Sequence, residues 1–507
     1  MPRPRVLSFL AALGLGAVGA PPAAADPAPE LRLAGPETAP RPIGLTARVR
    51  AHASLVAASD VPTDRDGTVY RLDPTLDTQL RIRADYRLAL GAAQTHILTL
   101  AFEHDLASGV VAGGPAPFDG VFAPYAADAD DHLLRAAFAR LSLGNVLTLQ
   151  AGATTSHWGL GLLANDGAHG WTPGSARFTD PRGGDRVLRA LVATGPHTDA
   201  DILAFAAVDD VLGDDVLLPG DEAWQAVAGV LVGRADGDAQ VGVYGVYRTT
   251  EAADGDRTTI GVADLYGRLH GTLGQLDLTA ELEAALVFGT TELAPTADHP
   301  DHDVLQGGLA LRLGLEACLG GAALDVLYAS GDAAFDDDTQ TGFRADRNFD
   351  LGLLLNDVVL AARTARTPIR AADPDLVGVP SEDLDRLPTR GAATNTLSIN
   401  PRGWLRPVDG LELYAGLLVA LSASDESDAF NARVSGGDPT NALGGAPGLL
   451  VATELDLGAR FSALFFGTRL VLGLEGGVLF PGAGLTGPGG LGDEPIWGGR
   501  ASITYEL

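Results

Sequence analysis

The sequence is poor in several residue types that other protein classes need. It contains one cysteine, Cys318, and a single methionine. One thiol cannot form an internal disulfide or a zinc cage built from several cysteines. Lysine is absent, so the 35 basic residues are all arginines, and the formal net charge is −30. A chain this acidic repels nucleic acid, which excludes that class of partner.

Long apolar runs and linkers are also missing. After residue 25, no uncharged apolar stretch reaches the roughly 18 residues of a membrane-spanning helix. No Ser/Pro-rich tract or block of charge divides the chain into soluble domains. The chain nevertheless has 46% hydrophobic residues and 65 glycines. A fold without spanning helices has to account for this composition.

Catalytic signatures are absent as well. The chain has no G-x-S-x-G, H-E-x-x-H or C-x-x-C motif. Ser156 and His157 are neighbours, but adjacent residues of a strand point to opposite faces. We therefore expect no enzyme, no cofactor and no structural metal. Acidic clusters at 128–131, 298–303 and 336–338 lack EF-hand spacing, and whether they bind calcium stays open.

The strongest positive signal is alternation with a period of two. From residue 275, polar residues such as Asp277 alternate with apolar residues such as Leu278 over about 14 residues. This predicts a strand much longer than the usual five or six residues of soluble proteins. Eighteen such segments are predicted, near residues 45–57, 76–90, 96–106, 132–142, 146–156, 186–195, 201–208, 223–233, 240–249, 257–270, 275–289, 304–319, 322–330, 395–404, 411–422, 450–464, 467–480 and 496–507.

The connections between these segments alternate between short and long. Short ones include 91–94, and long ones include 107–131, 157–185 and 331–394. An even number of strands with short turns at one end and long loops at the other is typical of bacterial outer-membrane barrels. The sequence therefore predicts an all-β fold, a transmembrane antiparallel β-barrel of about 18 strands (16–18), with short periplasmic turns and long extracellular loops.

Both ends of the chain fit export and membrane assembly. Arg3 and Arg5 precede an apolar stretch, and residues 23–25 form an A-x-A cleavage site. We predict a signal peptide at 1–25, a periplasmic segment at 26–44 and the barrel at 45–507. In the last strand, Trp497 and Tyr505 share one face, which resembles the C-terminal strand recognised by barrel-assembly machinery, although Leu507 replaces the usual terminal aromatic.

Three further stretches resemble a known group of proteins. They are SHWGLGLLANDG from Ser156, FRADRNFD with LGLLLNDVVL from Phe343, and NPRGWLRPVDGLELYAG from Asn400. They are similar to porin-like exported proteins related to the alginate-export barrels. The resemblance implies an 18-stranded pore. Within the loop 331–394, apolar residues also recur at helical spacing, which predicts a helix folded either into the lumen or over the rim.

Function is expected in the lumen. When the barrel closes, arginines of the first, second and last strands become neighbours and form one wall. Acids of the eleventh strand lie nearly opposite this wall. The predicted pore-lining residues are Arg48, Arg50, Arg81, Arg83, Arg87, Arg500, Asp277, Glu281 and Glu283. Opposed walls of charge would impose a transverse field on passing solutes, unless the charges simply pair with their neighbours.

Three functions remain open at this point. The first is a passive outer-membrane channel for small hydrophilic or anionic solutes or saccharides. The second is a polysaccharide-export pore of the alginate-export type. The third is a plugged barrel that serves as a surface adhesin or structural anchor. Outer-membrane lipid, lipopolysaccharide and the barrel-assembly machinery are the expected partners, whereas substrate, pore radius and oligomeric state are not specified by the sequence.

The predicted export signal can be checked directly. Protein recovered from outer membranes should begin at Asp26, because the small residues at 23–25 form the cleavage site. Mass spectrometry of the intact protein measures this. A mass that retains residues 1–25 would contradict the prediction.

Overall fold

We describe a computed structural model of the chain. It covers residues 43–91, 95–113, 132–167, 173–174, 184–195, 201–233, 237–295, 299–333, 337–349, 351–366, 383, 386, 388–424, 440–465 and 467–507. The predicted signal peptide and most of the predicted periplasmic segment lie outside these residues. No helix among the residues described is long and apolar enough to span a membrane.

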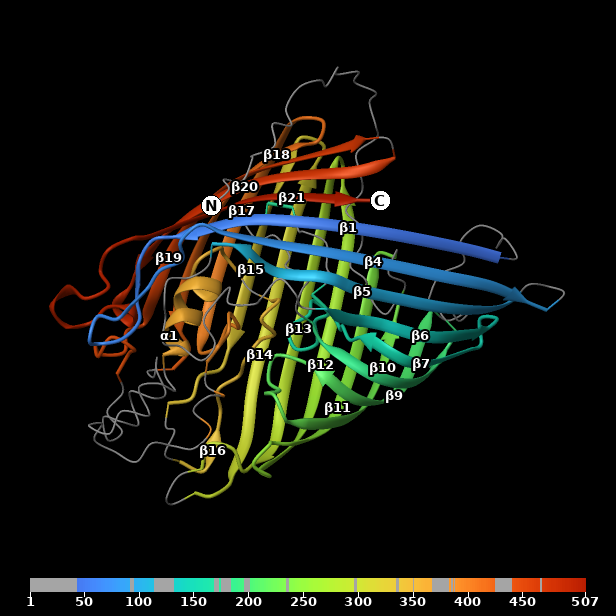
Figure 1. Ribbon diagram of the computed structural model, residues 1–507, viewed down its shortest axis with the longest axis horizontal. Helices are drawn as coiled ribbons and strands as arrows, with labels where there is room; N and C mark the ends of the chain where they lie inside the picture. The colour runs from blue at the N-terminus through green and yellow to red at the C-terminus, as the bar shows by residue number, and fades with distance from the viewer. Residues whose placement is uncertain are drawn as a thin grey trace, which may run out of the picture.

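Eighteen long strands form one closed antiparallel sheet (Figure 1). In ring order they are β1 (Ile43–Ala58), β4 (Thr75–Leu90), β5 (His96–Ala112), β6 (Leu133–Leu143), β7 (Leu147–Thr155), β8 (Arg186–Thr194), β9 (Ile202–Gly213), β10 (Glu222–Val232), β11 (Ala239–Glu251), β12 (Arg257–Leu273), β13 (Leu276–Thr291), β14 (His302–Ala317), β15 (Gly320–Ala329), β17 (Thr396–Val408), β18 (Leu411–Ser422), β19 (Leu450–Phe465), β20 (Thr468–Pro481) and β21 (Ile496–Glu506). Each predicted segment coincides with one of these strands, so the predicted fold class and strand number are confirmed.

The smaller elements lie in the loops. A hairpin of β2 (Val61–Pro62) and β3 (Val69–Tyr70) follows β1, and β16 (Thr339–Gln340) adds a short parallel partner to β14. The longest loop contains a helical segment, η1 (Leu355–Leu360) continuing into α1 (Ala361–Ala365). Figure 1 shows short turns at the right-hand rim of the barrel and long connections at the left-hand rim.

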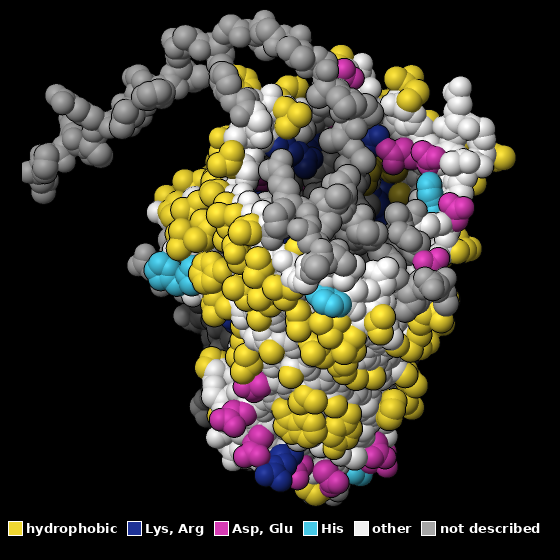
Figure 2. Space-filling model, turned by 90° about the vertical axis from the view of Figure 1, so that its right-hand side faces the viewer, with side chains coloured by type: hydrophobic (Ala, Val, Ile, Leu, Met, Phe, Trp, Pro, Cys, Tyr) yellow, Lys and Arg dark blue, Asp and Glu magenta, His cyan; other side chains and the backbone are white. Residues whose placement is uncertain are grey.

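The strands carry apolar side chains outside and polar side chains inside. On β19, Leu457 is 66% exposed, whereas its neighbour Asp456 is 1% exposed. On β20, Leu474 is 65% exposed beside Glu475 at 3%. Figure 2 shows the outward apolar side chains as yellow areas over the barrel surface. This is the inverse of a soluble protein and the arrangement that a barrel surrounded by lipid requires.

Pairing between the first and last strands closes the sheet. β21 pairs with β1 over nine residue pairs from Arg50–Glu506 to Ala58–Gly498. Beyond β21, Leu507 donates to the Val49 carbonyl at 2.9 Å, and the Val49 amide donates to the Leu507 carbonyl at 3.1 Å. Closure leaves neither β1 nor β21 as a free edge.

Deleting Tyr505–Leu507 should prevent barrel closure, because these residues pair with both β1 and β20. On gels of unboiled samples, we therefore expect the band of the folded barrel to disappear. The matched variant Tyr505→Leu keeps the backbone pairing and should retain that band. Normal membrane insertion of the truncated protein would contradict the role of this closure.

Candidate functional site

The segment between β7 and β8 folds into the barrel instead of staying at the rim. Near its start, the Leu162 amide donates to Glu283 of β13 at 3.2 Å, and the Leu160 amide donates to the same carboxylate. Further along, the Gly174 amide donates to Glu412 of β18 at 3.1 Å. β18 lies nearly opposite β7 in the ring. The segment therefore crosses the lumen.

Trp158 anchors this crossing to the wall. Its indole N–H donates to Asp264 of β12 at 2.9 Å. Its ring stacks on Tyr244 of β11 with centroids 5.0 Å apart and lies 6.2 Å from the ring of Phe205 on β9. An indole needs both an apolar surface and an acceptor when it is buried, and the inward wall supplies both.

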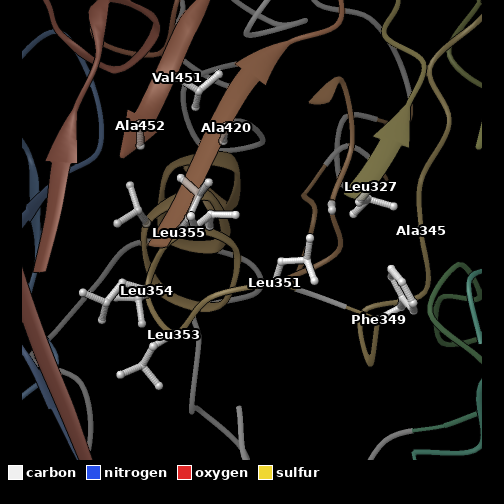
Figure 3. Close-up of a cluster of buried hydrophobic side chains, with 14 of the residues drawn as sticks. Leu327, Ala345, Phe349, Leu351, Leu353, Leu354, Leu355, Ala420, Val451 and Ala452 are labelled. Carbon is white, nitrogen blue, oxygen red and sulfur yellow. The ribbon is translucent and has the colours of Figure 1, made fainter. Parts of the chain in front are cut away.

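The longest loop also enters the lumen. The amides of Leu353, Leu354 and Leu355 donate to Glu454 of β19 at 2.5, 2.8 and 2.9 Å. The η1–α1 segment that follows is buried, including Val359 and Ala362 at 0% exposure. Figure 3 shows Leu353, Leu354 and Leu355 beside the strands that carry Ala420, Val451 and Ala452. Of the two sequence-based alternatives for this helix, the structure places it inside the barrel.

The two loops meet each other. The Asp346 amide donates to the Leu162 carbonyl at 2.8 Å. Leu162, Phe349 and Leu351 belong to one buried apolar cluster. The loops thus form a single partition within the barrel, which we call the lumen partition (described residues 157–167, 173–174, 343–349 and 351–366).

Sequence reasoning missed that these two loops share a repeat. Leu160–Asp166 reads LGLLAND and Leu351–Asp357 reads LGLLLND, so six of seven positions are identical. Both copies follow an aromatic residue by two positions, Trp158 in one and Phe349 in the other. Aligning residues 160–166 with residues 351–357 reveals the repeat from the sequence alone. Its structural meaning depends on Glu283 and Glu454, which are far away in the sequence.

All six predicted arginines lie on inward-facing positions of β1, β4 and β21. Arg81 is 7% exposed and makes a bidentate pair with Asp105 of β5 at 2.6 and 2.8 Å. Arg83 contacts Asp85 at 2.9 Å and Glu103 at 3.0 Å. Neighbouring acids therefore neutralise the charges of Arg81 and Arg83. Hydrophobic periodicity alone did not predict these ion pairs.

The other four arginines differ in their partners. Arg50 lies 3.4 Å from Glu506, and Arg500 lies 3.8 Å from Glu475. Arg48 and Arg87 are exposed, near the rim with the short turns. Arg48 is directly opposite Arg83 in the β1–β4 register. Of these four residues, Arg48 and Arg87 bring positive charge to the accessible part of the inner wall.

The three predicted acids of β13 also face inward but are not equivalent. Asp277 is exposed near the rim, opposite Glu316 of β14. Glu281 lies 3.8 Å from Arg312 and accepts from the Tyr266 hydroxyl at 3.3 Å. Glu283 is 0% exposed because the lumen partition covers it. It supports a loop, whereas Asp277 remains accessible.

A cavity of about 500 Å³ lies between the lumen partition and strands β8 to β14. Its barrel side carries the apolar residues Val187, Val246, Val262, Val287 and Val304 together with the polar residues Gln225, Arg248 and Gln306. Its loop side includes the charged residues Arg344, Asp346 and Arg390. A lining that combines apolar and charged groups suits small molecules with both characters.

Burial changes the charge of the loop side. It raises the pKa of Asp185 well above its usual range, and the nearby Asp346 carboxylate adds to the shift. Burial, followed by Asp215, raises the pKa of Asp346 in the same way. Burial and the neighbouring Arg390 lower the pKa of Arg344 to about 10, which leaves it charged at neutral pH. Asp185 and Asp346 therefore resist ionisation, while Arg344 keeps its charge.

The candidate catalytic and metal-binding side chains are held by other contacts. His157 contacts the Gly159 carbonyl at 3.1 Å, and Ser156 accepts from Arg189 at 3.1 Å, so each side chain is engaged in holding the loop or the wall. Within the described ranges, one carboxylate group, Asp254, Asp256 and Asp383, brings its oxygens within 4.8 Å of one another. Asp383 is already bound by Arg386 at 3.3 Å. Residues 128–131, Asp298 and Asp336 lie outside the described residues.

Comparison with known proteins identifies the fold. The *Pseudomonas aeruginosa* porin OccK2 (OpdF) matches with a TM-score of 0.51 and 11% identity over 91% of this chain and 97% of that one. A BenF-like porin from *Pseudomonas fluorescens* Pf-5 matches with a TM-score of 0.51 and 10% identity over 91% and 98%. The chain has the fold of the outer-membrane porins. No family model and no curated protein matches the sequence, and the alginate-export resemblance is not confirmed.

The pair Arg81–Asp105 should contribute strongly to stability, because removing Asp105 takes both short contacts of the bidentate pair from the buried Arg81 and leaves it the longer contact to Glu103 at 3.8 Å. Asp105→Ala is expected to cost about 3–5 kcal/mol of unfolding free energy. As a control, Asp85→Ala breaks the more exposed pair with Arg83 and should cost about 0–1 kcal/mol. Urea unfolding in detergent measures both, and equal costs would contradict the assignment.

Proposed function

We propose that the protein is a passive channel of the bacterial outer membrane for small hydrophilic solutes, with a preference for anions. The apolar outer face supports a location in the outer membrane, with lipid and lipopolysaccharide around the barrel and the barrel-assembly machinery inserting it. The porin fold also supports a non-enzymatic role.

The observation that carries the anion preference is the row of inward arginines on three adjacent strands. Arg48 and Arg87 are exposed there. Arg50, Arg83 and Arg500 belong to the same row, but they lie beside Glu506, Asp85 and Glu475 respectively. Arginine stays protonated at any ordinary pH. The fixed positive charge of the exposed arginines attracts anions into an aqueous path. The predicted pore-lining set thus stays a proposal, with Arg48, Arg87 and Asp277 as its most accessible members.

A solved neighbour is consistent with this class of solute. *P. aeruginosa* OpdK, whose structure was determined with vanillate, matches with a TM-score of 0.50 and 12% identity over 91% of this chain and 98% of that one. Vanillate is a small carboxylate with an apolar ring. The cavity described above combines apolar residues with Arg344, which suits the same combination of groups.

A second function is favoured by one observation. The lumen partition crosses from β7 to β18 and fills part of the interior. A barrel closed by such loops would serve as a surface anchor or adhesin and would not conduct. For the polysaccharide-export alternative, no feature of the described lumen adds support beyond the sequence resemblance.

Neutralising the accessible arginines should reduce anion selectivity. The double variant Arg48→Gln with Arg87→Gln removes two inward charges, so the reversal potential across a salt gradient should move toward the value for cations. The effect should persist at high salt, where the Debye length falls to about 3 Å and charge on distant loops is screened. Planar-bilayer recordings measure this.

The matched control is Arg257→Gln, which removes an exposed charge paired with Glu251 near the opposite rim. It should leave the reversal potential at high salt unchanged. If the double variant behaves like this control, Arg48 and Arg87 do not line the conduction path.

A further inference from the structure

The two copies of the LGLLxND repeat have the same local geometry. Gly161 and Gly352, the second residue of each copy, both have φ of 83°, a conformation that glycine adopts without strain. The Asn165 side chain donates to the Gly161 carbonyl at 3.2 Å, and Asn356 donates one position earlier in its own copy, to the Leu351 carbonyl at 3.5 Å. Both copies therefore contain a glycine turn and an asparagine bonded back to the start of the repeat, and the second copy continues into η1.

Each copy binds one carboxylate of the barrel wall through its backbone. Leu162 and Leu353 occupy the same place in the repeat, and their amides donate to Glu283 and Glu454 respectively. One additional amide reaches Glu283 and two additional amides reach Glu454. Both glutamates are 0% exposed. Several backbone amides of one turn thus converge on the side chain of one glutamate, as in a backbone nest, and here the group that is bound belongs to the protein itself.

These contacts hold loop segments that lie inside the barrel. The amides of the turn are buried and need acceptors, and the side-chain oxygens of Glu283 and Glu454 supply them. Glu283 and Glu454 lie on β13 and β19, so the wall holds the lumen partition from two separate positions. The partition is one unit, because the two loops share a hydrogen bond and an apolar cluster.

We propose that LGLLxND is a duplicated latch, and that Glu283 and Glu454 are positioning residues that fix the constriction of the channel. This inference rests on the proposed channel function. Neither glutamate needs to contact a solute. Each acts through the loop that it holds, and releasing either latch lets its loop move and widens the path.

The test uses the full-length protein in planar bilayers. Glu283→Ala and Glu454→Ala should each raise single-channel conductance by about twofold or more and increase current noise, since the narrowest section dominates the resistance of a pore. Glu283→Gln and Glu454→Gln keep one acceptor oxygen and should give intermediate values. The folded band on gels of unboiled samples shows whether an alanine variant folds. If it does not fold, the glutamine variants still test the proposal.

The matched control is Glu316→Ala, which removes an inward carboxylate that pairs with Arg406. It removes the same side chain from the inner wall without touching the lumen partition, so conductance and noise should stay at the wild-type level. Folded latch variants that behave like Glu316→Ala would overturn the latch. If the wild-type barrel does not conduct but the latch variants do, the latch is supported and an open wild-type channel is contradicted. If wild-type and latch variants are all silent, the latch does not set a constriction.

Discussion

Backbone hydrogen bonding in a medium without water is the constraint on which the structure depends. Lipid offers no partner for an amide or a carbonyl, so a sheet that spans it has to close. Here β1 pairs with both β4 and β21, and Leu507 and Val49 complete the seam. The long alternating strands, the even strand number and the outward apolar side chains all follow from this requirement.

The same constraint applies inside the barrel. Loops that enter the lumen bury their own amides, and the wall supplies acceptors at Glu283 and Glu454. Buried arginines make a comparable demand, which Asp105 satisfies for Arg81 and Asp325 for Arg402 at 2.7 Å. Much of the inward charge therefore holds the structure together. We propose that exposed arginines such as Arg48 and Arg87 face passing solutes.

The fold could be predicted from the sequence because each strand carries its signal locally. Alternation of Asp277 and Leu278 and their neighbours is visible without knowing which strands pair. The same alternation placed all nine candidate residues on inward-facing positions. It could not show that Glu283 is covered or that Asp105 neutralises Arg81, because those contacts join residues 121 and 24 positions apart. The repeated LGLLxND segment was visible in the sequence, but its carboxylate partners were not.

The central claim is that small anions pass through this barrel, and a matched pair of solutes tests it most directly. Glucose and glucuronate have nearly the same size and differ in one carboxylate. Liposomes containing the protein, with a potassium carrier to balance charge, should swell faster in potassium glucuronate than in glucose. Equal swelling would contradict the anion preference, and no swelling beyond protein-free liposomes would contradict the channel itself.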